Sequence, residues 1–238
     1  MPDQPINPQS DARALAERAF ACEQTFGPDH PETALSLNAL AERLQADGDF
    51  ENARAFFEKA LMIFEAALGP DHPDTATALA NLANLYQAQG DLDAARPLFE
   101  RALAIYEAKV GPAHPWTATA LNNLGSVLQD QGNLEEAQAL YERALAIREK
   151  VLGTDDPATA TCCSNLAHLF EEQGDLANAL AFYRRGLFIR EKSLGSDSPW
   201  TKVLAQAMSG ALDTLGRREE AAALRRRYNL SNDDSDNV

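Results

Sequence analysis

The spacing of the glycines constrains this chain more than any other feature. Glycines recur every 42 residues in two sets. The first set is Gly27, Gly69, Gly111, Gly153 and Gly195, and the second is Gly48, Gly90, Gly132, Gly174 and Gly216. Self-similarity at a fixed period of this size is typical of stacked supersecondary units, none of which can bury its apolar face alone. The period therefore predicts one elongated array of five repeats.

Each repeat has the start and stop signals of a helical hairpin. A proline opens the first helix, where its missing N–H costs nothing, and a glycine of the second set ends that helix. Loop lengths of a few residues indicate antiparallel helices of roughly 15 to 17 and 17 to 19 residues. A threonine follows each proline by two positions, and we expect its hydroxyl to reach back to the free N–H groups of the first turn. The prolines are Pro31, Pro73, Pro115, Pro157 and Pro199, and the threonines are Thr33, Thr75, Thr117, Thr159 and Thr201.

The boundaries follow from the same signals. We predict a disordered lead-in at residues 1–9, a helical array at 10–228 and an acidic disordered tail at 229–238. Within the array an extra N-terminal helix covers 10–26. The repeats start near residues 27, 69, 111, 153 and 195.

Recurring residue types indicate how the helices pack. Small residues share one position in the second helix of every repeat, which permits close helix approach. Aromatic residues share another and should fill the facing gap. The small residues are Ala53, Ala95, Ala137, Ala179 and Ala221, and the aromatic ones are Phe57, Phe99, Tyr141 and Tyr183.

The third repeat carries a family resemblance. Asn123-Leu124-Gly125, followed by Leu128, Gly132, Ala137, Tyr141 and Ala144, resembles the tetratricopeptide repeat. The longer unit of 42 residues, with Asp-His-Pro before the first helix, is similar to the repeats of kinesin light chains and of related bacterial proteins. The resemblance implies an all-α fold, a right-handed α-solenoid or superhelix of five hairpins with an extra N-terminal helix.

The resemblance also implies a function, which is protein–protein interaction through a concave groove lined by the first helix of each repeat. Asparagines on that helix would bond to the backbone of an extended peptide or a helical segment, because an amide both donates and accepts. The matching residues are Asn81, Asn123 and Asn165. Neighbouring positions on the same face add Asn38, Asn84, Asn122, Ser126, His168, Thr77, Thr119 and Thr161.

The net charge of the chain narrows the class of partner that it can bind. The chain has 36 Asp and Glu against 21 Lys and Arg, which disfavours nucleic acid and anionic membranes because both require cationic surfaces. The groove positions carry no Lys or Arg, so the expected ligand is neutral or basic unless Arg148 and Arg190 turn inward. No apolar run is long enough to span a bilayer, and we expect a cytoplasmic protein.

Several residues invite a catalytic interpretation. His30, His72 and His114 precede helix-opening prolines, but stacked helices hold equivalent positions about 8 to 10 Å apart, too far for one metal ion. Helix capping explains them better, as it does Asp156 and Ser198. Cys162 and Cys163 are expected to fill the core, and Trp116 and Trp200 to cover apolar surface. No catalytic motif occurs, so we predict no enzyme activity, cofactor or metal.

Two alternatives to peptide binding stay open. The chain could be a self-associating structural scaffold, a homo-oligomer with no peptide in the groove. An enzyme is the third possibility, and it would need a pocket with perturbed titratable groups.

Overall fold

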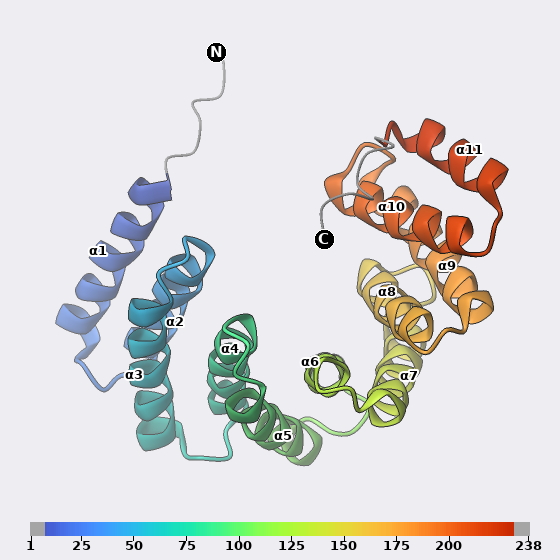
Figure 1. The fold of residues 1–238 in the computed structure, drawn as a ribbon. Coiled ribbons are helices and arrows are strands. Elements are labelled where there is room, and N and C mark those ends of the chain that lie inside the picture. The colour runs from blue at the N-terminus through green and yellow to red at the C-terminus, as the bar shows by residue number, and fades with distance from the viewer. Residues whose placement is uncertain (1–7, 231–238) are drawn as a thin grey trace. The chain divides into compact units, whose positions relative to one another are not determined.

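Every element of the fold is a helix in the computed structural model, which describes residues 8–230 (Figure 1). Within these residues there are eleven helices and no strand. They are α1 (Pro8–Phe26), α2 (Pro31–Ala46), α3 (Phe50–Leu68), α4 (Pro73–Ala88), α5 (Leu92–Lys109), α6 (Pro115–Asp130), α7 (Leu134–Val151), α8 (Pro157–Glu172), α9 (Leu176–Leu194), α10 (Pro199–Thr214) and α11 (Arg218–Tyr228). Most of the predicted lead-in, residues 1–7, and of the predicted tail, residues 231–238, lies outside the described part.

The chain divides into two compact units, Met1–Val127 and Leu128–Val238. In the first unit α2 packs on α3 and α4 on α5, while α1 contacts α2 and α3 contacts α4. In the second unit α8 packs on α9 and α10 on α11, while α7 contacts α8 and α9 contacts α10. Within each unit these successive helices are therefore neighbours in space, as the period predicts for stacked hairpins.

Histidines and an aspartate begin the first helices of four repeats. The Nδ1 atoms of His30, His72 and His114 and the Oδ1 atom of Asp156 accept the N–H two residues later, at 2.8–3.2 Å. Capping of these helices is thus confirmed. Ser198 was expected to act likewise, but its side chain makes no capping bond.

The threonines after the prolines act differently from the expectation. Each hydroxyl donates to the carbonyl of the loop glycine six residues earlier, at 2.7–3.0 Å, instead of accepting from the first turn. The fifth repeat has no capping side chain, yet its threonine bonds in the same way, so the hydroxyl stabilises the loop whether or not the helix is capped. These residues are Thr33, Thr75, Thr117, Thr159 and Thr201, and all are fully buried.

The link between α4 and α5 shows why glycine ends the first helix. Gly90 has φ +79°, a left-handed conformation that residues with a Cβ atom rarely adopt. Its N–H bonds to the Gln87 carbonyl at 2.9 Å, and the next residue, Asp91, caps α5 through Ala94 N–H. The last helix, α11, has only 11 residues, fewer than predicted, because Asn229 takes the left-handed conformation and closes it.

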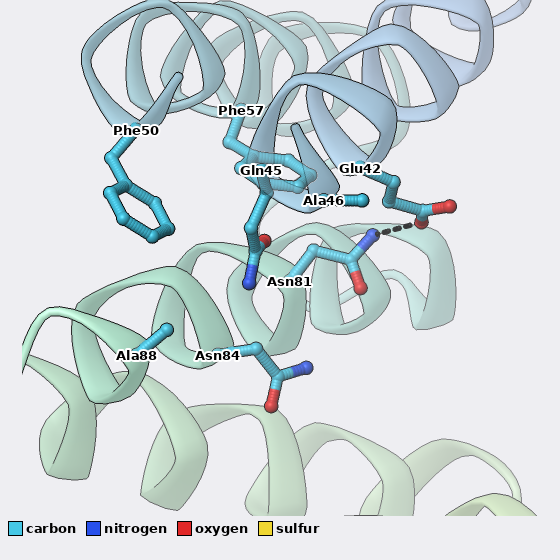
Figure 2. Close-up of a pocket in the computed structure, with 8 residues that line it drawn as sticks. All are labelled: Glu42, Gln45, Ala46, Phe50, Phe57, Asn81, Asn84 and Ala88. Carbon is cyan, nitrogen blue, oxygen red and sulfur yellow. Dashed lines mark hydrogen bonds between the residues drawn. The ribbon is translucent and has the colours of Figure 1, made fainter. Parts of the chain in front are cut away.

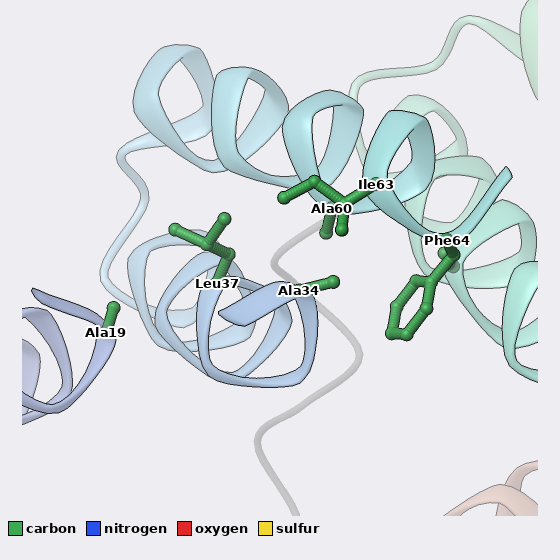
Figure 3. Close-up of a cluster of buried hydrophobic side chains, with 7 residues drawn as sticks. Ala19, Ala34, Leu37, Ala60, Ile63 and Phe64 are labelled. Atoms are coloured by element: carbon green, nitrogen blue, oxygen red, sulfur yellow. The ribbon is translucent and has the colours of Figure 1, made fainter. Parts of the chain in front are cut away.

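The core consists of the recurring small and aromatic residues. The five alanines at the shared position of the second helices are fully buried. The aromatic residues at the other shared position are fully buried too, namely Phe57, Phe99, Tyr141 and Tyr183. In the first unit Ala34 and Leu37 of α2 meet Ala60, Ile63 and Phe64 of α3 (Figure 3). Ala19 of α1 joins the same cluster, so the extra helix covers apolar surface of the first hairpin.

Candidate functional site

Two hollows lie side by side in the first unit, and they share Asn81 and Asn84 of α4. The first hollow has a volume of about 590 Å³ and the second about 420 Å³. Both volumes fall in the range of ligand-binding clefts. We call the surface formed by the two hollows the unit-1 groove.

The first hollow is formed by α2, α3 and α4. Figure 2 shows Glu42, Gln45 and Phe50 reaching from α2 and α3 toward α4, which carries Asn81 and Asn84. Asn81 Nδ2 donates to Glu42 Oε1 at 3.0 Å, so a bond between two repeats orients this amide. Its other lining residues are Ala46, Phe57 and Ala88.

The second hollow is formed by α4, α5 and α6. Tyr106 enters it from α5, and its hydroxyl lies 2.8 Å from Thr77 Oγ1. Trp116, in the first turn of α6, stands at a centroid distance of 6.0 Å and an interplanar angle of 55° from the Tyr106 ring. The remaining lining residues are Ala80, Asn81, Asn84, Thr119, Ala120 and Asn123.

The lining of the groove includes an acidic residue but no basic one. Neither hollow is lined by Lys, Arg or His, and the first is lined by one acid, Glu42. Burial raises the pKa of the Tyr106 hydroxyl, the Thr77 hydrogen bond opposes this, and the nearby carboxylate of Asp74 raises the pKa further. Tyr106 therefore stays neutral at physiological pH.

The structure brings five of the predicted site residues together. They line the unit-1 groove: Thr77, Asn81, Asn84, Thr119 and Asn123. Ser126 accepts a bond from Gln87 Nε2 at 2.9 Å. Asn38 and Asn122 are only 6% and 9% exposed, so their side chains offer little surface to a ligand.

The three predicted residues of the second unit lie on α8. Asn165 and Thr161 are half-buried, and His168 is exposed but has its ring packed against Tyr183 at a centroid distance of 5.3 Å. The Tyr183 hydroxyl donates to Glu171 Oε2 at 2.6 Å, so its oxygen is left to accept from His168 Nδ1 at 2.8 Å. Desolvation lowers the pKa of His168, although Glu171 and Glu172 act in the opposite direction.

The two arginines that could make the groove basic each bind a backbone carbonyl. Arg148 is buried and its Nη1 donates to the Ala158 carbonyl at 2.5 Å. Arg190 makes the equivalent bond to the Trp200 carbonyl at 2.9 Å. Both guanidinium groups thus bind the first turn of the following first helix.

The sequence interpretation missed the aromatic wall of the second hollow. Trp116, which was expected to cover apolar surface, packs against Tyr106 and keeps 51% of its own surface exposed. The signal was its departure from the period, since the equivalent residues of the flanking repeats are Asp74 and Ala158. The residues equivalent to Tyr106 in the flanking repeats also differ from it, and they are Phe64 and Arg148.

The described residues hold no group of three or more His, Cys, Asp or Glu placed to bind a metal ion. None of the described helices has the length and apolarity required to cross a membrane.

Consecutive helical hairpins of constant period define an all-helical repeat protein of the α-solenoid class. The chain belongs to the tetratricopeptide repeat family, whose model matches residues 10–65, 44–108 and 116–192. Proteins with this fold generally mediate protein–protein interaction or scaffolding and are generally not enzymes.

Solved structures agree with this assignment. BtubC (BKLC) from P. vanneervenii superposes with a TM-score of 0.77 at 23% identity, over 95% of this chain and 91% of that one, which is a likeness of fold. A Podosopora anserina protein described as a putative kinesin light chain with nearly identical TPR-like repeats gives 0.71 at 27% identity, over 84% and 95% of the two chains. A variant of that protein with a single substitution gives the same TM-score and identity. The resemblance to kinesin light chain repeats is confirmed. A comparison with curated proteins gave no match.

Proposed function

We propose that the protein is an interaction module that binds an extended peptide or helical segment of a partner protein in the unit-1 groove. The observation that carries the proposal is that the two hollows meet at Asn81 and Asn84. A peptide crossing both hollows would pass these amides, with side chains entering on either side.

The amides suit recognition of a main chain. Glu42 engages Asn81 Nδ2, so we assign Asn81 Oδ1 the role of accepting a peptide N–H. Asn84 and Asn123 can both donate and accept. Hydrogen bonds to the peptide backbone do not depend on the side chains of the peptide. Specificity then comes from the peptide side chains that fill the hollows.

The proposal includes the chemistry of the partner and the place of the interaction. A neutral or basic segment fits best, because the lining has no cation and includes Glu42. We extend the site to Thr161, Asn165 and His168, the equivalent positions of α8. A cytoplasmic location agrees with the buried thiols of Cys162 and Cys163.

A displayed library of random peptides selected on the full chain tests the proposal. We expect selected peptides to bind the wild-type protein and to lose about tenfold or more in affinity with Asn81→Ala/Asn84→Ala, since each lost hydrogen bond contributes about 1 kcal/mol. The control is Asn178→Ala on α9, an exposed asparagine that bonds to Asp175. Binding that the double variant leaves intact would contradict the proposal.

Light scattering on the same samples addresses the alternative function. Growth of mass with concentration, together with no groove-dependent peptide, would favour a self-associating scaffold over a peptide-binding module.

A further inference from the structure

We propose that the second hollow is a pocket for a positively charged side chain, arginine or lysine, of the bound peptide. The inference rests on the proposed function and names the side chain that this part of the groove selects.

The aromatic rings form a corner that is fixed before a ligand arrives. Tyr106 is only 7% exposed and its hydroxyl is bonded to Thr77, so the ring cannot swing away. The His114 ring packs against the Trp116 ring at a centroid distance of 5.0 Å and an angle of 69°, and His114 Nδ1 accepts the backbone N–H of Trp116 at 3.1 Å. At a centroid distance of 6.0 Å and an angle of 55°, Tyr106 and Trp116 contact each other as a tilted aromatic pair. Trp116 is 51% exposed, so its indole is the π surface that a ligand in the hollow can reach. A cation within about 6 Å of such rings is attracted by their quadrupoles.

The polar part of the lining favours a cation over an apolar side chain. Thr77, Thr119, Asn81, Asn84 and Asn123 place hydroxyl and amide oxygens around the same hollow. These oxygens can accept from a guanidinium or ammonium group, which has donors only. An aromatic or aliphatic occupant would remove them from water without replacing their hydrogen bonds, which costs free energy.

The charge around the pocket acts in the same direction. No Lys, Arg or His lines the hollow, and Asp74 is close enough to Tyr106 to raise the pKa of its hydroxyl. Residues 1–127 carry 18 Asp and Glu against eight Lys and Arg. The field of this unit therefore attracts cations to the groove.

The fifth repeat provides an internal comparison. Trp200 occupies the position of Trp116 and is 66% exposed. The residue equivalent to Tyr106 is there Arg190, whose guanidinium is bonded to the Trp200 carbonyl. A positive charge bonded to the backbone of Trp200 repels a second cation, so Trp200 is a matched tryptophan that should bind none.

The experiment uses peptides that the wild-type chain selects and that Asn81→Ala/Asn84→Ala weakens. We expect a basic residue at one fixed position of these peptides. Replacing that arginine by citrulline, or that lysine by norleucine, should lower the affinity for the wild-type protein on the order of tenfold. Trp116→Leu should show a smaller difference between the two versions, because the indole contribution is lost, whereas Trp200→Leu should keep the full wild-type preference.

Indole fluorescence gives a second readout. In a Trp200→Phe protein the remaining tryptophan is Trp116, and its emission should change with the basic peptide more than with the citrulline or norleucine version. Half of this indole is exposed, so Trp116→Leu should fold, and circular dichroism checks that it does.

The possible failures are distinguishable. Groove-dependent peptides that carry an aromatic or aliphatic residue in place of the basic one, or that bind equally well without the charge, overturn this inference and leave the proposed function standing. Loss of the preference in Trp200→Leu also overturns it. If no peptide depends on Asn81 and Asn84, both the proposed function and this inference are wrong.

Discussion

Glu65 of α3 forms an ion pair with Arg101 of α5, with Oε1 and Nη1 2.7 Å apart. The pair joins the second helices of neighbouring repeats. The same separation of 36 residues recurs at Glu23 with Lys59, Glu149 with Arg185 and Glu191 with Arg227, at 3.6, 2.5 and 2.6 Å. An acid and a base in fixed positions of a 42-residue unit thus link each of these helices to the next.

Reversing one charge of this series should weaken the contact between repeats. The two side chains are 40% and 35% exposed, and such pairs contribute at most about 1 kcal/mol. We expect Arg101→Glu to lower the free energy of urea unfolding by about 1 kcal/mol. Arg101 also donates to the Pro70 carbonyl, so Glu65→Arg/Arg101→Glu should recover only part of the loss. Arg13→Gln, in a pair that is far more exposed, is the control. Full recovery in the double variant would show that the Pro70 bond contributes nothing.

Two glycines should respond to alanine in opposite ways. Gly90 has φ +79°, and Gly210 lies inside α10 in ordinary helical conformation; a Cβ atom would meet nothing within 4 Å at either one. Gly90→Ala should destabilise the protein by about 1 kcal/mol because of backbone strain. Gly210→Ala should stabilise it by about 0.5 to 1 kcal/mol because alanine loses less entropy in a helix. Thermal unfolding of both variants decides this, and shifts of the same sign would contradict it.

The three thiols should differ in reactivity. Cys162 and Cys163 are fully buried, and burial raises the pKa of Cys163 to about 11. Cys22 is partly exposed. A disulfide reagent at pH 8 should therefore modify one thiol of the native protein quickly and all three after denaturation, because the thiolate is the reactive form. Cys22→Ser should abolish the fast phase, and its persistence would show that a buried cysteine is accessible.

His168 should make stability dependent on pH. Its pKa is lowered in the folded protein, so between the folded value and the unfolded value of about 6.5 the unfolded chain binds more protons. Its contribution is complete above the unfolded pKa and is lost as the pH falls toward the folded one. Wild-type protein should lose more stability than His168→Gln between pH 7.5 and pH 5 in urea titrations.

The direction of this shift can be measured separately. The NMR titration of His168, identified by its absence in His168→Gln, should give a pKa below 6.5. Tyr183→Phe should keep that direction, because desolvation is the largest cause and the Tyr183 hydrogen bond is not. An ordinary or raised value would refute the prediction.

The sequence alone determined the repeat architecture, and the reason is physical. Pro31 and its equivalents can only open a helix, and Gly48 and its equivalents supply the left-handed conformation that ends one. These constraints are local, so they can be read residue by residue. The burial of Ala53 and Phe57 follows from the period too, because each repeat must present the same face to its neighbour. Capping by His30, His72 and His114 was equally local and was predicted.

Only the tertiary structure decided how the candidate site is built. The hollow between Tyr106 and Trp116 needs side chains from three helices of two repeats, and no local rule brings residues ten positions apart into one corner. The engagement of Arg148 and Arg190 by backbone carbonyls and the burial of Asn38 depend in the same way on packing. The period specifies which positions face one another. The volume left between them depends on the size and the orientation of the facing side chains.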